Sequence, residues 1–205
     1  MISQDPNISA IILAAGKAAR MDKIKQLLPF RDGTVLGRVV QNALDSSLHE
    51  AIVVLGHAAE EIRRVIDFGH ARIVINADYC EGQSTSLRTG LAAISADSDA
   101  AVFILGDQPL VGPDVIDALV KCYRQQSAPF IVPTYQGKRG NPVLIARAVF
   151  HRLESLEGDV GARILFDEYA DRLCEIEMGD KSIAFDVDTL DDYALLQGME
   201  KDVIG

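Results

Sequence analysis

Residues 11–26 read IILAAGKAARMDKIKQ, and this stretch carries more information than any other in the chain. Its first three residues form an apolar run typical of a strand buried on both faces, and a turn of small residues at 14–16 follows directly. Small residues let backbone N–H groups approach a ligand closely. Cations suited to a polyphosphate come next: Lys17, Arg20, Lys23 and Lys25. The stretch predicts a nucleoside triphosphate site at the end of a first β-strand.

The same stretch differs from the two common phosphate-binding loops. It lacks the G-x-x-x-x-G-K-[ST] of the P-loop, and it has one glycine, Gly16, where the dinucleotide fingerprint G-x-G-x-x-G needs three. Taken in isolation, these residues also fit a strand followed by an ordinary basic surface loop. The interpretation as a nucleotide site therefore depends on what the rest of the chain adds.

The composition favours a globular protein that binds a small anion. The chain has 205 residues, 48% of them hydrophobic, which is enough to bury a full core in a domain of ordinary size. Its formal net charge of −10 argues against nucleic acid or an anionic membrane as the main partner. Residues 16–38 nevertheless carry six cations against two acids, whereas residues 154–205 carry fifteen acids against four cations. A local basic segment on an acidic protein indicates a small-anion site; chance clustering is the alternative explanation.

The cysteines and the first residues predict a cytoplasmic protein. Cys80, Cys122 and Cys174 are widely spaced and form no C-x-x-C pair, which argues against a zinc site or a disulfide framework. Residues 1–6 lack the basic region and apolar run of a signal peptide, and no segment is long and apolar enough to span a bilayer. We therefore expect reduced thiols and no membrane partner.

Apolar runs of strand length alternate with amphipathic segments of helix length up to residue 133. The expected strands are near-continuous in apolar and β-branched residues, as strands buried on both faces should be: Ser9–Ala14, Ala51–Leu55, Arg72–Asn76, Ala100–Leu105 and Phe130–Pro133. The expected helices lie between them: Thr34–Ser46, Ala59–Asp67, Ser84–Ser95 and Pro113–Gln125. This order predicts a three-layer α/β fold, in which helices cover both faces of a doubly wound, mostly parallel sheet.

The pattern changes after residue 133. A polar stretch containing glycine precedes a short expected strand at 143–145. The remaining elements are two helices, two short strands and a last helix that begins at Leu190: Ala148–Ser155 and Val160–Ala170, then Leu173–Met178 and Ser182–Val187. These segments predict a small mixed β extension toward the C-terminus. Since no repeat, low-complexity tract or linker interrupts the chain, one domain is the simplest interpretation.

An acidic residue follows the fourth expected strand. Asp107 comes after the apolar run at 100–105, so it lies at the carboxyl edge of the sheet, where parallel sheets bind ligands. A lone Asp in this position is commonly a turn or helix-cap residue. A carboxylate that faces a triphosphate across a cleft is also the usual way to hold Mg²⁺, together with waters and phosphate oxygens. Because the small-residue turn ends a neighbouring strand, we favour the metal.

Two further segments suggest ligand contacts. Alternation along an extended segment puts Asp186 and Asp188 on one face, where a shared cation would relieve their repulsion. They also fit a solvated acidic strand end in which Thr189 caps the last helix. The loop at 82–86 joins a glycine to small hydroxyl residues at a helix start, which suits a base edge or a phosphate. Its alternative is a plain helix cap.

Several short motifs occur in a fixed order along the chain: LAAG at 13–16, RM at 20–21, KQLL at 25–28, GQSTSL at 82–87, GDQP at 106–109, GNPV at 140–143, GDVGAR at 158–163 and DVDT at 186–189. This ordered set resembles the molybdenum cofactor cytidylyltransferases, which belong to the Rossmann-like nucleotidyltransferases. The resemblance covers about residues 8–197 and implies one nucleotidyltransferase domain over that range. LAAG resembles the cytidylyl branch, because the guanylyl branch usually has LAGG.

The resemblance implies a reaction in which CMP passes from CTP to the terminal phosphate of molybdopterin, or of its molybdenum-bearing form, and pyrophosphate leaves. Mg²⁺ is the implied cofactor, and a client molybdoenzyme is a possible partner. The implied catalytic residues are Arg20, Lys25 and Asp107. The implied nucleotide contacts are Leu13, Ala14, Ala15, Gly16, Lys17, Arg20, Lys25, Gly82, Gln83, Ser86 and Asp107. The implied acceptor contacts are Gln108, Asn141, Asp159 and Arg163, and the implied metal ligands are Asp107, Asp188 and Asp186.

The chain departs from this family pattern at three positions. Ala18 replaces Ser or Gly, Asp22 replaces Gly and adds a negative charge near the implied phosphates, and Asn141 stands where many relatives have His. Two other functions stay open. One keeps the fold and transfers the nucleotide to a sugar phosphate or a polyol phosphate. The other is a carrier that binds the cofactor nucleotide without turnover; the presence of Arg20, Lys25 and Asp107 argues against it.

Overall fold

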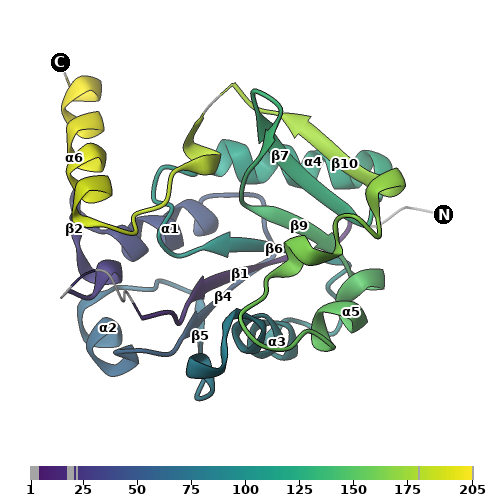
Figure 1. The fold of residues 1–205 in the computed structure, drawn as a ribbon, viewed down its shortest axis with the longest axis horizontal. Helices are drawn as coiled ribbons and strands as arrows, with labels where there is room; N and C mark the ends of the chain where they lie inside the picture. Colours follow the sequence, from purple (N-terminus) through teal and green to yellow (C-terminus); the bar gives the residue numbers. More distant parts are fainter. Residues whose placement is uncertain (1–4, 18–20, 22, 180, 205) are drawn as a thin grey trace.

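The strand that ends in the small-residue turn lies in the middle of the main sheet (Figure 1). The computed structural model describes residues 5–17, 21, 23–179 and 181–204. In it β1 (Ile8–Ala14) pairs in parallel with β4 (Glu50–Leu55) on one side and β6 (Ala100–Leu105) on the other. β5 (Arg72–Ile75) extends the sheet in parallel beyond β4.

The register of these strands brings their carboxyl ends level with one another. Leu13 of β1 lies opposite Leu105 of β6, and Ala14 lies opposite Leu55 of β4. The segments after each strand are joined as well, because the backbone N–H of Gly106 donates to the carbonyl of Leu13 at 2.9 Å. The turn after β1 and the loop after β6 therefore meet at the same edge of the sheet.

The sheet becomes mixed beyond β6. β9 (Val143–Ala146) lies antiparallel between β6 and β7 (Phe130–Tyr135), and the short β8 (Lys138–Arg139) pairs antiparallel with the end of β7. β10 (Leu173–Glu177) pairs in parallel with the outer side of β7. The strand order is β10-β7-β9-β6-β1-β4-β5, which confirms the predicted mostly parallel sheet with a mixed extension.

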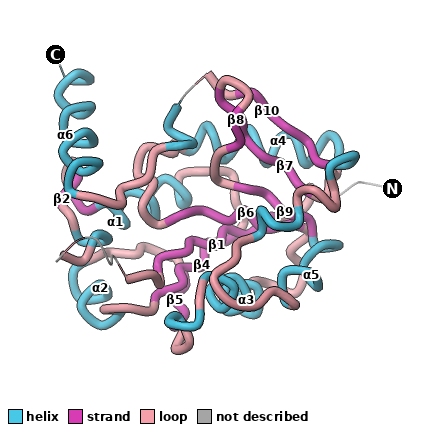
Figure 2. The backbone as a smooth tube through the Cα atoms, in the orientation of Figure 1, coloured by secondary structure: helices cyan, strands magenta, loops and turns pink. Residues whose placement is uncertain are grey.

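Helices cover both faces of the sheet and confirm the three predicted layers. One face carries α1 (Val35–Leu44), α2 (Ala59–Val65) and α4 (Pro113–Gln126), and the other carries α3 (Gln83–Ala93) and α5 (Phe150–Glu154). Figure 2 shows α3 and α5 side by side. Neighbouring residues of β1 face opposite layers, since Ile12 packs with the first set and Ile11 with the second. Burial on both faces explains why the central strands read as continuous apolar runs.

The prediction of a helix over Val160–Ala170 is wrong. The structure has one 3₁₀ turn, Ala162–Leu165, followed by further turns. Its apolar side chains pack into the core as a helix face would, and the Phe166 ring lies 5.3 Å from that of Phe130. The apolar residues in this segment are spaced as in a helix because successive turns of the chain each pack one of them into the core. The helix expected over Ala148–Ser155 is also shorter than predicted, because a 3₁₀ turn precedes α5.

The prediction of a strand over Ser182–Val187 is also wrong. Lys181–Ala184 forms a 3₁₀ turn, and residues 185–188 after it belong to neither a helix nor a strand. Residues of the 182–187 segment form backbone hydrogen bonds with two loops instead. Asn141 N–H donates to the carbonyl of Ile183 at 2.8 Å, and Val187 N–H donates to the carbonyl of Asp107 at 3.1 Å. These contacts fasten the C-terminal segment over the carboxyl edge of the sheet.

The sequence analysis missed a small hairpin beside this edge. β2 (Pro29–Phe30) and β3 (Gly33–Thr34) follow a 3₁₀ turn at Lys25–Leu27. The predicted last helix is confirmed as α6 (Leu190–Ile204), and its Leu196 packs with Phe30 and Val187 in a separate apolar cluster. Over the described residues, none of the helices combines the length and apolar character needed to cross a membrane.

Candidate active site

Two neighbouring cavities open at the carboxyl edge of the sheet. The first, which we call the nucleotide-side cavity, has a volume of about 530 Å³ and lies against the turn at 14–17, the loop at 79–83 and Asp107. The second, the acceptor-side cavity, has a volume of about 410 Å³ and lies against β6, the 139–141 loop and the segment at 161–163. Leu13, Gln83 and Leu105 line both. Each volume is in the range of small-molecule sites.

The nucleotide-side cavity gathers most of the residues predicted to bind nucleotide: Leu13, Ala14, Ala15, Gly16, Lys17, Lys25, Gly82, Gln83, Ser86 and Asp107. Arg20 lies outside the described residues. Asp159, predicted to contact the acceptor, lines this cavity instead. Sequence reasoning missed Tyr79, Cys80 and Glu81, which also line it and precede the predicted loop directly.

A buried glutamine holds the small-residue turn in place. The Gln26 side chain is 3% exposed, and its Nε2 donates to the carbonyls of Ala14 at 3.1 Å and Gly16 at 3.2 Å. With both carbonyls engaged from one side, the shape of the turn is set before any ligand arrives. Sequence reasoning missed Gln26; a polar residue among Ile24, Leu27 and Leu28 was the available signal.

The loop that starts α3 is joined to the segment at 158–159. Ser84 N–H donates to the carbonyl of Gly158 at 3.2 Å, and Gln83 N–H donates to Asp159 Oδ1 at 3.2 Å. Gly82 has a φ of +111° and a ψ of 173°, a region that is essentially restricted to glycine. A Cβ at this position would also clash with the backbone of Gly158 and Asp159. Glycine is therefore required for this wall of the nucleotide-side cavity.

Replacing Gly82 with Ala should weaken nucleotide binding as well as stability. The strained backbone costs on the order of 1–3 kcal/mol, and relief of the clash moves the 158–159 segment that lines the cavity. Thermal unfolding and equilibrium nucleotide binding measure the two effects. Gly137→Ala is the matched control, because Gly137 has a φ of +72° with nothing within 4 Å of a Cβ. Nucleotide affinity that is equal in the two variants would show that this close approach does not shape the site.

Lys25 joins two carboxylates from distant parts of the chain. Its Nζ lies 2.5 Å from Asp107 Oδ2 and 3.0 Å from Asp188 Oδ1. The Lys25 and Asp107 side chains are 14% and 17% exposed, whereas that of Asp188 is 49% exposed. Burial alone would lower the pKa of Lys25, but the charges and hydrogen bonds of the two carboxylates outweigh it and leave the pKa raised. The amine therefore stays protonated at neutral pH.

Asp107 and Asp188 fit a divalent cation. Both reach one point in space, which Lys25 Nζ now marks, and Asp107 Oδ1 is buried with no hydrogen-bond partner among the described residues. Mg²⁺ is commonly held by one or two carboxylates together with waters and substrate phosphates. In the part of the chain that the structure describes, no three acidic, His or Cys side chains gather into a metal site. A metal here would therefore draw its other ligands from water and substrate.

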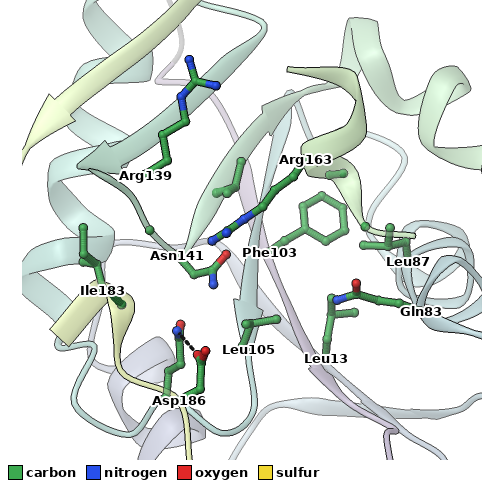
Figure 3. A pocket seen from close by; sticks show the side chains of 16 residues that line it. Leu13, Gln83, Leu87, Phe103, Leu105, Arg139, Asn141, Arg163, Ile183 and Asp186 are labelled. Atoms are coloured by element: carbon green, nitrogen blue, oxygen red, sulfur yellow. Dashed lines mark hydrogen bonds between the residues drawn. The ribbon is translucent and has the colours of Figure 1, made fainter. Parts of the chain in front are cut away.

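Asp186, the third predicted metal ligand, makes a different contact from those of Asp107 and Asp188, although their charges act on it. Asp186 Oδ1 accepts a hydrogen bond from Gln108 Nε2 in the acceptor-side cavity (Figure 3). Burial, followed by the nearby charge of Asp107, raises the pKa of Asp186. The chain turns into α6 directly after Val187, where Thr189 N–H and Oγ1 donate to Asp192 Oδ2 at 2.8 and 2.7 Å. This turn aims Asp188 at Lys25 instead.

Thr189 also caps the last helix, as the alternative interpretation of this segment expected. Asp192 N–H donates to Thr189 Oγ1 at 3.1 Å, which makes a reciprocal cap with the bonds to Asp192 Oδ2. The cap does not use the carboxylate of Asp188, whose Oδ1 contacts Lys25. The segment therefore combines a helix start with a charged contact at the sheet edge.

The acceptor-side cavity carries polar side chains over an apolar floor. Gln108, Asn141 and Arg163, all predicted to contact the acceptor, line it, and Figure 3 shows Arg163 reaching toward Asn141. Arg139 also lines it, although its Nε is engaged by Glu175 Oε1 at 2.7 Å. A second cavity with cationic and amide groups beside a phosphate-type turn suits transfer between two substrates.

The sequence matches a known protein family. The family described as "MobA-like NTP transferase domain" matches residues 10–173. The chain belongs to this family. The protein is therefore a nucleotidyltransferase by family. Its sheet and helix layers are those predicted from the sequence.

Individual relatives of this MobA-like protein differ in their described activities. It is 27% identical to the molybdenum cofactor cytidylyltransferase of Escherichia coli (strain K12) over 91% of this chain and 93% of the relative. It is 28% identical to the nicotine blue oxidoreductase of Paenarthrobacter nicotinovorans over 93% and 97% of the two chains. The crystal structure of Rv0371c from Mycobacterium tuberculosis H37Rv superposes with a TM-score of 0.84 at 32% identity, covering 94% of this chain and 99% of that one. Rv0371c has also been solved in complex with manganese.

Proposed function

We propose that this protein transfers CMP from CTP to the terminal phosphate of molybdopterin, or of its molybdenum-bearing form, and releases pyrophosphate. The observation that carries the proposal is the contact of Lys25 with Asp107 and Asp188 where the turn after β1 meets the loop after β6. A cation and a two-carboxylate metal site at one point suit the handling of a triphosphate. The relative from Escherichia coli supports the choice of acceptor and nucleotide.

Each cavity has one substrate in this proposal. The backbone of the turn at 14–17 surrounds the nucleotide phosphates, and Gly82, Gln83 and Ser86 contact the base and ribose. Asn141, Arg163 and Gln108 hold the acceptor in the second cavity. Because Leu13, Gln83 and Leu105 line both cavities, the two cavities adjoin, and the acceptor phosphate can approach the α-phosphorus across this shared wall. Alignment of the two substrates supplies a large part of the rate enhancement.

The charged residues act on the triphosphate. Lys25 neutralises the charge that develops on the departing pyrophosphate, and Arg20 is proposed to share this role. Mg²⁺, held by Asp107 and Asp188, supplies Lewis-acid neutralisation of the phosphate oxygens when it is bound. No covalent bond to the protein is needed. Asp186, engaged by Gln108, contributes to the acceptor-side cavity rather than to the metal.

The domain bounds, the cellular location and the partner of the protein are proposed as well. We propose that residues 8–197 form one domain, since a single sheet joins residues 8–177 and α6 packs against the hairpin beside it. A cytoplasmic location is proposed from the sequence, because its three cysteines are odd in number and form no C-x-x-C pair. The structure brings Cys122 Sγ within 3.1 Å of Cys174 Sγ without a disulfide bond. A client molybdoenzyme is the proposed receiver of the product.

CTP should be used in preference to GTP and ATP. A site that pairs the edge of one base leaves buried polar groups unpaired when another base enters, and such losses reach about 100-fold or more in kcat/KM. Pyrophosphate release with molybdopterin as the acceptor, measured for the three nucleotides, tests this. Release that needs the acceptor and favours CTP supports the proposal. Equal use of CTP and GTP, or preference for GTP, would show that Ala14 and Ala15 do not indicate the cytidylyl branch.

A further inference from the structure

We propose that Lys25 occupies the divalent-cation position in the free protein and has to leave it before the metal binds, so that this lysine couples metal binding to nucleotide binding. The inference rests on the proposed function for the identity of the nucleotide. Its first part, the competition between the lysine and the metal, concerns the protein alone. Lys25 thus acts as a gate on the metal site in addition to its role toward the phosphates.

The geometry leaves room for one cation at this point. Lys25 Nζ contacts Asp107 Oδ2 and Asp188 Oδ1 at 2.5 and 3.0 Å. A metal held between these two carboxylates would lie near the point that Lys25 Nζ occupies, and two cations cannot share that point. Both sides of the site are fixed, since Val187 N–H donates to the carbonyl of Asp107 and holds the two segments together. Metal and lysine therefore compete for one pair of ligands.

Lys25 leaves one oxygen of the two carboxylates without a hydrogen-bond partner among the described residues. Asp107 Oδ1 is buried and has no hydrogen-bond partner in the described part of the chain. A buried carboxylate oxygen without a partner carries a free-energy cost that a bound divalent cation would remove. The site is therefore ready for a stronger cation once Nζ moves away.

The nucleotide-side cavity provides the place to which Lys25 can move. Its side chain lines this cavity together with the turn at 14–17, where phosphates are proposed to lie. Four methylene groups let Nζ reach a phosphate while the backbone stays in its 3₁₀ turn. Arrival of the triphosphate thus draws the ammonium off the carboxylates and frees them for the metal. By linkage, the metal strengthens nucleotide binding by the same factor.

The test measures Mn²⁺ binding to the full-length protein by electron paramagnetic resonance of the free ion, first without nucleotide. Lys25→Met should bind Mn²⁺ about tenfold or more tightly than the wild type, within the usual range of such couplings. Methionine is chosen because a thioether is a poor ligand for Mn²⁺. Lys121→Met is the matched control, since Lys121 is exposed on α4 and lines neither cavity, and the Mn²⁺ affinity of this variant should equal that of the wild type. Unchanged or weaker binding by Lys25→Met overturns the proposal.

Three further measurements test where the additional Mn²⁺ binds and how its binding is coupled to the nucleotide. Adding Asp107→Asn to Lys25→Met should abolish the gain; a gain that persists would place the ion elsewhere and also overturn the proposal. The shift of the unfolding midpoint on addition of Mn²⁺ should be larger for Lys25→Met than for the wild type, a readout that holds even if the variant is less stable. Repeating the titration with CTP, but no acceptor, should raise Mn²⁺ affinity more in the wild type than in Lys25→Met; an equal rise in both would contradict the coupling.

These outcomes separate the gate from the proposed reaction. The titration with Mn²⁺ alone contains neither nucleotide nor acceptor, so it can succeed in a protein that has another substrate. Failure of CTP to bind in the presence of Mn²⁺ would count against the proposed function, while the gain in Lys25→Met would still support competition at the metal site.

Discussion

Asp107→Asn is expected to lower metal-dependent turnover by about 1,000-fold, the upper end of losses for a single electrostatic group, while the protein stays folded. Only Gly106 separates Asp107 from the end of the central strand β6, and the Asp107 side chain is only 17% exposed, so we expect its carboxylate to be held rigidly. Neutralising it removes one of the two proposed metal ligands and leaves Lys25 with a single partner. The Mg²⁺ dependence of pyrophosphate release measures the loss.

Two other carboxylates provide the comparison. Asp188→Asn should be milder, because its side chain is 49% exposed and lies on the segment that leads into α6. Asp171→Asn, an exposed change in the 170–172 turn before β10, should leave both rate and Mg²⁺ response unchanged. An Asp107→Asn enzyme with a normal Mg²⁺ response would show that Asp107 is a turn residue and that the metal lies elsewhere.

Lys25→Ala should lower kcat by about 100-fold or more, as expected for a group that mainly stabilises the transition state. Its stability should fall far less, because added Mg²⁺ can replace the ammonium between Asp107 and Asp188. The variant is thus expected to bind metal more tightly and to turn over more slowly, a combination that simple unfolding cannot produce. Steady-state kinetics and thermal unfolding, each with and without Mg²⁺, measure the two effects.

Lys121→Ala controls for the loss of a positive charge, since Lys121 is exposed on α4 and lines neither cavity. It should keep a near-normal kcat. A Lys25→Ala protein with near-normal kcat on CTP and molybdopterin would remove Lys25 from the catalytic residues.

The central sheet could be predicted because its strands are buried on both faces. β1 and β6 consist almost entirely of buried apolar residues, so composition alone marks them as inner parallel strands. Their parallel pairing then places the turn after Ala14 and the carboxylate of Asp107 at one edge. Most residues predicted to bind nucleotide accordingly line one cavity, whereas its wall at 79–81 was missed and Arg20 lies outside the described residues.

The strand at 173–177 and the last helix were predicted, but the segments at 160–170 and 182–188 were not, because long-range contacts decide their structure. The alternation of Asp186 and Asp188 suggests that both side chains lie on one face. In the structure, Val187 N–H donates a hydrogen bond to the carbonyl of Asp107, and the chain then turns into α6. The apolar spacing around Leu165 fits a helix, yet those residues pack from successive turns. The Gln26 side chain donates to carbonyls that precede it by ten and twelve residues, and a short sequence motif does not reveal such a contact.

The most direct test of the proposed reaction follows the α-phosphorus of CTP. Wild-type protein, Mg²⁺, molybdopterin and CTP labelled at the α-phosphorus are combined under single-turnover conditions, and the products are separated. We predict that the label enters a product containing both the pterin and cytidine, in equal amount with the pyrophosphate released. Label that appears only as free CMP, or that stays in CTP, would contradict the account.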